Sequence, residues 1–284
     1  MPRPSHKERH ETALSTPTVQ RNRVSQAADR CSTHSMPGQI YIGTAGWSIP
    51  RASAHHCPPG GTHLERYARL FTCAEINSSF YRSHEAATYA KWAASTPDDF
   101  RFAIKMPRLI THEHKLRRSR APFERFLAEA TGLGRHRGPL LVQLPPSFAF
   151  EARAAARFFD MMRERDEGPV VCEPRHPTWF SARADALMSR SAVARVAANP
   201  AIAEASNAPG GWNGIAYFRL HGAPRMYWSR YEASHLSRLA TLVRQISESV
   251  DVWCVFDNTA SGAAMENAWE LRQLLGSEPG HGLR

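Results

Sequence analysis

The stretch from Val170 to Phe180, VVCEPRHPTWF, is where several chemically capable side chains lie close together in the sequence. It opens with the apolar run from Val170 to Cys172, and prolines among the polar residues that follow prevent a helix from running through them. A short apolar run bounded by turn formers predicts a buried strand. We therefore expect a strand that ends in a stiff loop presenting a carboxylate, a guanidinium, an imidazole and an indole, from Glu173, Arg175, His176 and Trp179.

Charged and polar side chains recur at the ends of the other predicted strands. Because successive side chains of a strand point to opposite faces, residues two apart share a face. Arg101, Ala103 and Lys105 thus share one face, whereas Phe102 and Ile104 point the other way, toward the helices. The same alternation brings charged and polar residues to one end of the sheet. The acidic residues are Glu75, Glu173 and Asp257, the basic residues are Lys105, Arg175 and Arg219, and the other polar residues are Asn77, Gln143 and His221.

The elements that position these side chains alternate strictly between strand and helix. The predicted strands are residues 40–42, 73–76, 100–105, 140–144, 170–172, 193–196, 215–220 and 252–256, and the sixth helix is the least clear of the helices that follow them. Thr62 and Glu65 have the spacing of a capping box at the start of the first helix. Such alternation predicts a parallel sheet, and eight units in about 240 residues predict an α/β fold of the TIM-like (β/α)8 barrel type as a single domain. A doubly wound open sheet is the alternative, but the chain lacks a Gly-rich dinucleotide-binding turn.

In such a barrel the carboxyl ends of the strands and their loops build the functional site. An unpaired charge at that depth costs several kcal/mol, so the acids and bases must pair with one another or bind a ligand. One interpretation is therefore a structural ion-pair network that closes the barrel. We favour the other, a polar ligand site, because a merely stable barrel would fill that layer with Val, Ile or Leu.

Arginine and lysine suit a phosphate or a carboxylate, so Lys105, Arg175 and Arg219 are the candidate anion-binding residues. Glu173, His221 and Asp257 are the candidate catalytic acid–base residues. Aromatic side chains offer stacking faces for a ligand ring: Trp47, Tyr81, Trp179, Tyr227 and Trp228.

Other reaction classes fit the sequence less well. Common barrel glycosidases carry two carboxyl groups at the ends of strands four and seven, where this chain has Gln143 and His221. The sequence contains no nucleophile elbow and no P-loop. We predict no metal and no other cofactor, since the nearby Arg and Lys would repel a cation; a divalent metal is the alternative, with ligands drawn from Glu75, Glu173, His221, Asp257, His112 and His176.

The composition is that of a globular protein with a basic balance. A net charge of +10 over 284 residues favours an anionic partner, either a small molecule or nucleic acid. Five cysteines without a C-x-x-C pair indicate a reducing compartment, which predicts a cytoplasmic protein. The sequence contains no run of about 18 apolar residues, so it predicts no membrane-spanning helix.

The ends of the chain differ from the rest. Residues 1–38 are polar and mildly basic, without the apolar segment of a secretory signal. We expect a disordered tail there, or residues upstream of a misassigned start codon. The barrel is expected over residues 39–276, and residues 277–284 are expected to be frayed.

Several motifs in order resemble one family. They are GTAGWS (43–48), EINSSFYR (75–82), FRFAIKMPRLITHEHKL (100–116), LLVQLPPSF (140–148), EPRHPTWF (173–180), YFRLHG (217–222) and FDNTASGAA (256–264). Over about Ile40 to Leu275 they are similar to the YecE-like family, called domain of unknown function 72. The resemblance implies a TIM-like barrel in a bacterial or archaeal cytoplasm but supplies no established activity. By resemblance, the family's characteristic polar positions are Glu75, Asn77, Lys105, Glu173, Arg175, His176, Arg219, His221, Asp257 and Asn258.

The sequence departs from the family pattern in two places. Residues 50–61 lack the aromatic-rich segment expected after the first loop, and Asn199-Pro200 stands where Asp-Pro is common. Three hypotheses therefore stay open: an enzyme-like barrel that binds a phosphorylated or carboxylated ligand, a nucleic-acid-binding or nucleic-acid-processing protein, and an interaction protein whose charged mouth is purely structural. The first is our main prediction.

Overall fold

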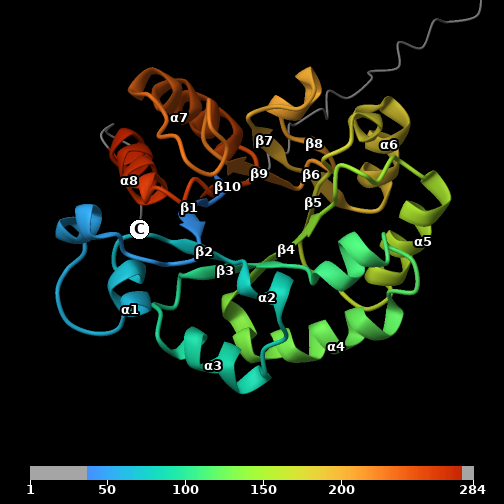
Figure 1. The fold of residues 1–284 in the computed structure, drawn as a ribbon, viewed down its shortest axis with the longest axis horizontal. Helices are drawn as coiled ribbons and strands as arrows, with labels where there is room; N and C mark the ends of the chain where they lie inside the picture. Colours follow the sequence, from blue (N-terminus) through green and yellow to red (C-terminus); the bar gives the residue numbers. More distant parts are fainter. Residues whose placement is uncertain (1–36, 277–284) are drawn as a thin grey trace, which may run out of the picture. The chain divides into compact units, whose positions relative to one another are not determined.

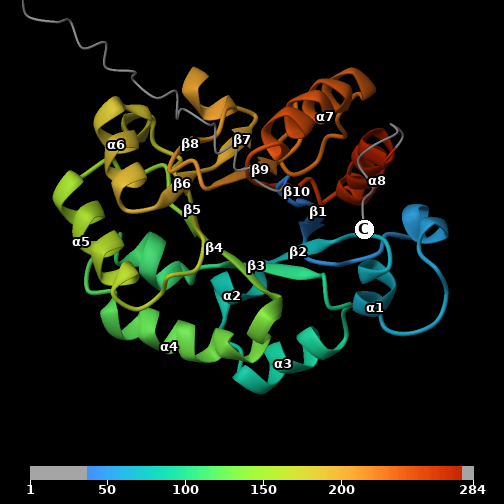
Figure 2. The same ribbon diagram turned by 180° about the vertical axis from the view of Figure 1, so that it is seen from behind.

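A computed structural model describes residues 37–276, so the predictions for the two ends of the chain lie outside the described residues. Seven strands form one parallel sheet in the order β9-β10-β1-β2-β3-β4-β5. Figures 1 and 2 show the helices arranged around the outside of these strands. The strand bounds are β1 (Ile40–Ala45), β2 (Cys73–Ile76), β3 (Arg101–Lys105), β4 (Arg137–Gln143), β5 (Val170–Glu173), β9 (Ile215–Leu220) and β10 (Asp251–Phe256).

The sixth strand of the barrel is split into two pieces. β6 (Val193–Arg195) pairs with β5, and β7 (Ala197–Asn199) pairs with β9. Between them the Val196 N–H donates to the Cys172 carbonyl at 2.9 Å. The chain therefore closes the ring by changing partner strands within one extended segment, and the predicted TIM-like (β/α)8 barrel is confirmed in its strands.

The sixth outer helix, the least clear of the predicted helices, is not formed in the segment after β7. The segment after β7 holds a short 3₁₀ turn (Glu204–Asn207) and then β8 (Gly210–Gly211), which pairs antiparallel with β6. Pro200 and Pro209 bound this segment, and the two glycines follow directly. Pro209 and these glycines disfavour a helix that continues beyond Ala208.

Outside this segment, helices alternate with the strands as predicted, and the short helix α2 (Ser78–Tyr81) is an addition to that pattern. The Thr62–Glu65 capping box is confirmed, because each side chain accepts from the other's backbone N–H. No helix among residues 37–276 is long and apolar enough to cross a membrane. The bounds are α1 (His63–Ala68), α2 (Ser78–Tyr81), α3 (Ala86–Ala94), α4 (Arg120–Ala130), α5 (Ala152–Arg163), α6 (Ala182–Arg190), α7 (Ala233–Ser247) and α8 (Ala263–Gly276).

Two separate apolar cores follow the alternation of the strands. Phe102 and Ile104 belong to the large core between sheet and helices, whereas Ala103 belongs to the smaller core inside the barrel. Trp253 lies in this inner core and stacks on Tyr41 and Tyr217, with ring centroids 4.5 and 5.9 Å away. The inner core therefore fills the lower part of the barrel, and the polar residues of the strand ends lie in the layer above it.

Candidate functional site

Arg219 of β9 is the centre of the polar layer. Its guanidinium is completely buried and donates to three carboxylates. Nε and Nη2 bind the two oxygens of Glu75 at 2.9 and 2.6 Å, Nη1 binds Glu173 Oε2 at 2.6 Å, and Nη2 also binds Asp257 Oδ2 at 2.9 Å. Burial alone would lower the pKa of Arg219, but these carboxylates raise it well above its ordinary value. The side chain is therefore a fixed cation in the structure.

Glu75 and Arg219 meet across the interior of the barrel. β2 and β9 are separated in the sheet by β1 and β10, so only inward-pointing side chains can join them. The residues in register with Glu75 on the neighbouring strands are Ala45 and Ala103, whose small side chains leave room for the long Arg219 side chain. Tyr217 donates from its hydroxyl to Glu75 Oε2 at 3.1 Å, and burial together with Glu75 raises the pKa of Tyr217.

A second set of contacts surrounds Glu173 and His221. His221 places Nδ1 3.1 Å from Asp257 Oδ2 and Nε2 2.8 Å from Glu173 Oε1, and its side chain is fully buried. Arg175 Nη2 lies 2.6 Å from Glu173 Oε1 and 2.8 Å from His221 Nε2. Gln143 Nε2 donates to the other Glu173 oxygen at 3.0 Å. Both ring nitrogens of His221 and both oxygens of Glu173 are thus engaged by neighbouring side chains.

The surrounding cations determine the ionisation of the acids. Burial by itself would raise the pKa of Glu173, but Arg219, Arg175 and His221 outweigh it and hold this pKa well below its ordinary value. The pKa of Asp257 is lowered in the same way, with Arg219, His221 and Lys105 opposing the effect of burial. Both carboxyl groups are therefore ionised near neutral pH.

Two polar groups of this layer remain open. Lys105 is only 7% exposed, yet its Nζ makes no hydrogen bond or ion pair within residues 37–276 and lies 4.4 Å from the ring centroid of Phe80. Asp257 Oδ1 also lacks a hydrogen-bond or ion-pair partner in the described part of the chain, and the Asp257 side chain is 10% exposed. Burial and Arg219 lower the pKa of Lys105, against the opposing effect of the three carboxylates.

A pocket of about 340 Å³ opens beside the network, between the loops that follow β3, β4, β5 and β9. Gln143 and Arg175 line it, together with His112, Met226 and Tyr227. Arg175 Nε is buried without a partner among the described residues, and the Tyr227 ring lies 5.4 Å from the His221 ring. Burial, Lys105 and Arg108 lower the pKa of His112 to about 4, with Glu113 opposing them, so this imidazole is neutral near pH 7. We call this pocket the mouth.

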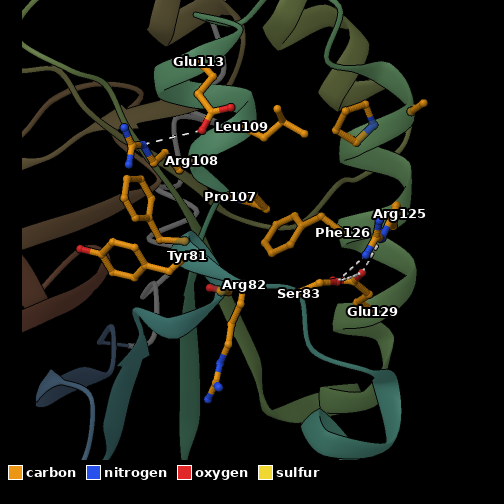
Figure 3. A pocket seen from close by; sticks show the side chains of 14 residues that line it. Tyr81, Arg82, Ser83, Pro107, Arg108, Leu109, Glu113, Arg125, Phe126 and Glu129 are labelled. Atoms are coloured by element: carbon orange, nitrogen blue, oxygen red, sulfur yellow. Dashed lines mark hydrogen bonds and ion pairs between the residues drawn. The ribbon is translucent and has the colours of Figure 1, made fainter.

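A larger pocket of about 560 Å³ lies next to the mouth, between α2, the π-helical turn Leu109–Glu113 and α4 (Figure 3). We call it the side pocket. In Figure 3 Phe126 of α4 points toward Pro107 and the segment that carries Tyr81. The Arg108–Glu113 ion pair stands at one end of it, and Arg125, Ser83 and Glu129 are joined at the other.

Acidic and histidine side chains of residues 37–276 do not gather into a metal site. No group of three or more His, Cys, Asp or Glu in that range is arranged to hold a metal ion. The acids of the barrel interior instead surround the guanidinium of Arg219.

A family model described as "Protein of unknown function DUF72" matches residues 41–282 of the chain. The chain belongs to this family. Among curated relatives, the UPF0759 protein YecE of Escherichia coli (strain K12) is 35% identical over 143 residues, so the match spans half of this chain and about half the length of YecE. The UPF0759 protein YunF of Bacillus subtilis (strain 168) is 23% identical over 273 residues, which cover 84% of this chain and 95% of YunF.

Two solved DUF72 structures share the fold. A DUF72 family protein from Enterococcus faecalis V583 superposes with a TM-score of 0.73 at 19% identity, over 84% of this chain and 96% of that chain. One from Thermotoga maritima MSB8 gives 0.70 at 22% identity, over 84% and 99%. The resemblance inferred from the sequence motifs is thus confirmed for the family and the barrel fold, and these likenesses at low identity concern the fold alone.

Six residues of the predicted site come together in this DUF72 protein, and Lys105 borders them. Glu75, Glu173, Arg175, Arg219, His221 and Asp257 form the network described above. The alternation of the strands predicts that all six face inward. Each of them follows a residue of the inner core by two or by four positions and therefore lies on the same face of its strand.

Other predicted ligand-binding residues lie outside the network. Trp179 is fully buried, and its indole N–H donates to the Phe148 carbonyl at 2.9 Å, so its ring packs inside the protein and has no exposed face. Trp47 packs edge-on against Trp92 and Phe102, on the helix side of the sheet.

The remaining predicted residues have local contacts or open faces. His176 accepts from the Thr178 N–H and caps a 3₁₀ turn. Asn258 donates to the Ser229 carbonyl and to Asn267, which ties the loop after β9 to α8. Asn77 begins α2, and its Oδ1 is buried without a partner in the described range. Tyr81 lines the side pocket and is 77% exposed.

The predicted site set lacked residues that the structure places at the centre. Tyr217 and Gln143 bond directly to Glu75 and Glu173, and the alternation that selected the charged residues also placed both on inward faces. Phe80, whose ring contacts Lys105, lies in the short helix α2, and Met226, whose sulfur lies 3.9 Å from Arg175 Nη1, lies in the loop after β9. Neither segment has a sequence pattern that identifies a facing residue.

Proposed function

We propose that the mouth of this DUF72 barrel binds a small anionic ligand, phosphorylated or carboxylated, and that the protein acts on it by proton transfer. The observation that carries the proposal is Lys105, a residue only 7% exposed whose ammonium group has no acceptor in residues 37–276. A buried cation without a direct partner is costly, and an anion at this position would relieve that cost.

The two interpretations of the charged layer, a structural ion-pair network and a ligand site, apply to different residues of that layer. Every oxygen of Glu75 and Glu173 has a partner, and all three guanidinium nitrogens of Arg219 are used. Glu75, Glu173 and Arg219 therefore have the properties of a structural ion-pair network, and Arg219 is not available to bind a ligand. Lys105 and Arg175 remain as the anion-binding residues, with Arg175 held by Glu173 at the edge of the mouth.

The same distinction applies to the candidate acid–base residues. Because both nitrogens of His221 are engaged, its role in the proposal is to position Asp257 rather than to meet the ligand. Asp257 has one free carboxylate oxygen and stays ionised, so it is the candidate general base, and its lowered pKa makes it a weaker base than an ordinary carboxylate. Glu173 fixes Arg175 and His221 and has no free oxygen for a ligand.

The test is calorimetric titration with inorganic phosphate and with malonate, on the protein and on Lys105→Met. Losing one charge-assisted hydrogen bond should weaken binding on the order of 10- to 100-fold. Lys91→Met, an exposed lysine of α3, is the matched control and should bind normally. Equal affinities in all three proteins would overturn the proposal. Binding only to a single-stranded oligonucleotide, with a steep salt dependence, would replace it with the nucleic-acid hypothesis.

A further inference from the structure

The side pocket has the size and lining of a binding site for the body of a small molecule. Its volume of about 560 Å³ falls in the range of ligand pockets, which are mostly apolar with a few polar groups. Phe80, Tyr81 and Phe126 supply aromatic rings, and Pro107 and Leu109 supply apolar surface between them. Tyr81 and Leu109 are 77% and 41% exposed, which makes them two of the few large apolar side chains left uncovered in residues 37–276.

The charged residues of the side pocket largely neutralise one another. Arg108 pairs with Glu113 at 3.8 Å, and Arg125 pairs with Glu129 at 2.9 Å. Arg82 also lines the pocket, but in Figure 3 its guanidinium points away from Phe126. The middle of the pocket is therefore uncharged, and the lining favours an uncharged planar ring that can stack on aromatic side chains.

Phe80 joins the side pocket to the proposed anion site. Its ring lines the pocket and also lies 4.4 Å from Lys105 Nζ. The adjacent Ser79 donates from its hydroxyl to the Lys105 carbonyl at 2.7 Å, which fixes this segment onto the end of β3. Pro107 and Leu109 follow Lys105 within the next few residues of the chain. The Lys105 ammonium and the side pocket therefore border the same aromatic ring.

We propose that the side pocket binds an uncharged aromatic or heteroaromatic ring belonging to the same ligand whose anionic group meets Lys105. This inference rests on the proposed function, because it assumes an anion at the mouth. It assigns the substrate class: a molecule with a negatively charged group at one end and a flat, uncharged ring at the other.

The experiment compares two phosphate monoesters of equal charge, methyl phosphate and phenyl phosphate, by calorimetric titration. Phenyl phosphate should bind at least tenfold more tightly than methyl phosphate. Tyr81→Ala and Leu109→Ala should each reduce this ratio several-fold and leave the affinity for methyl phosphate unchanged. Both residues are substantially exposed, so the variants should fold. Leu242→Ala, at an exposed position of α7, is the matched control and should keep the full ratio.

The outcomes separate the two proposals. If neither ester binds, the proposed anion site fails, and the inference about the ring fails with it. If both esters bind with equal affinity, the anion site stands and the ring subsite is overturned. If phenyl phosphate binds more tightly but neither Tyr81→Ala nor Leu109→Ala changes the ratio, the ring lies elsewhere and the side pocket is not its site.

Discussion

Arg219 of β9 and Glu75 of β2 form a two-pronged ion pair across the inside of the barrel, with both side chains fully buried. The pair joins strands that are not neighbours in the sheet. It therefore links opposite walls of the barrel above the apolar inner core. Because Arg219 also binds Glu173 and Asp257, one guanidinium compensates carboxylates from three different strands.

The first prediction concerns this hub. Arg219→Met should lower the free energy of unfolding by about 3–5 kcal/mol, because it leaves buried carboxylates without their cation. Urea unfolding followed by circular dichroism measures the change. Arg125→Met, which breaks an exposed pair with Glu129 on α4, should cost at most about 1 kcal/mol. Equal stabilities for Arg219→Met and the unmodified protein would show that the network contributes nothing to folding.

The second prediction is a loss of stability in acid that depends on Glu173 and Asp257. Their pKa values are lowered from ordinary values of 4.5 and 3.8, so below these values the unfolded chain binds more protons than the folded protein. Their contribution to stability is therefore fully present above about pH 5 and is lost as the pH falls through the folded-state pKa values.

Unfolding free energies measured between pH 7 and pH 3 test this dependence. Glu173→Gln should show a shallower fall toward acid than the unmodified protein, although it is less stable at pH 7. Glu167→Gln, at an exposed acid before β5, should keep the original slope. A slope in Glu173→Gln as steep as that of the unmodified protein would assign the acid sensitivity to other groups.

The inward faces of the strands could be predicted from the sequence because they depend on local alternation alone. That rule alone places Glu75, Glu173, Arg219 and Asp257 in one layer. Which partner each charge takes could not be predicted, because it depends on how far a side chain reaches across the closed barrel. Arg219 pairs with three carboxylates, whereas Lys105 pairs with none in residues 37–276. No pattern along the sequence distinguishes these two cations.

The directions of side chains are harder to predict from the sequence in loops than in strands. Trp179 stands close to Glu173 in the sequence, yet the 3₁₀ turn Pro177–Phe180 turns its indole toward Phe148 and away from the mouth. Phe80 lies in α2, which is only four residues long, so helical periodicity cannot indicate the direction of its ring. The missing sixth helix has the same origin, since prolines and glycines set the local path of the chain there.

The third prediction concerns His112, at the boundary of the mouth and the side pocket. Burial, Lys105 and Arg108 lower its pKa from 6.5 to about 4, against Glu113. Between these values the unfolded chain binds a proton that the folded protein does not, so His112 reduces stability as the pH falls from about 6.5 to about 4. Asparagine at this position removes the titration.

His112→Asn should therefore lose less stability over that pH range than the unmodified protein. A proton NMR titration of the His112 ring should also give a midpoint near pH 4. His63→Asn, at an exposed position of α1, is the control and should leave the pH dependence unchanged. A His112 ring that titrates near pH 6.5 would mean that burial, Lys105 and Arg108 do not lower its pKa.

The last prediction links Lys105 to the proposed ligand through its protons. Burial and Arg219 lower the pKa of Lys105 in the free protein, so part of the population loses its proton at an alkaline pH where an ordinary lysine remains charged. An anion bound beside Nζ favours the ammonium form and raises this pKa. Phosphate binding should therefore take up protons at alkaline pH below the ordinary lysine value of 10.5, and its affinity should fall as the pH rises through that range. Calorimetry in buffers of different ionisation enthalpy measures the proton uptake. This uptake should vanish in Lys105→Met and persist in the control Lys91→Met. An uptake of the same size in Lys105→Met would show that another group titrates.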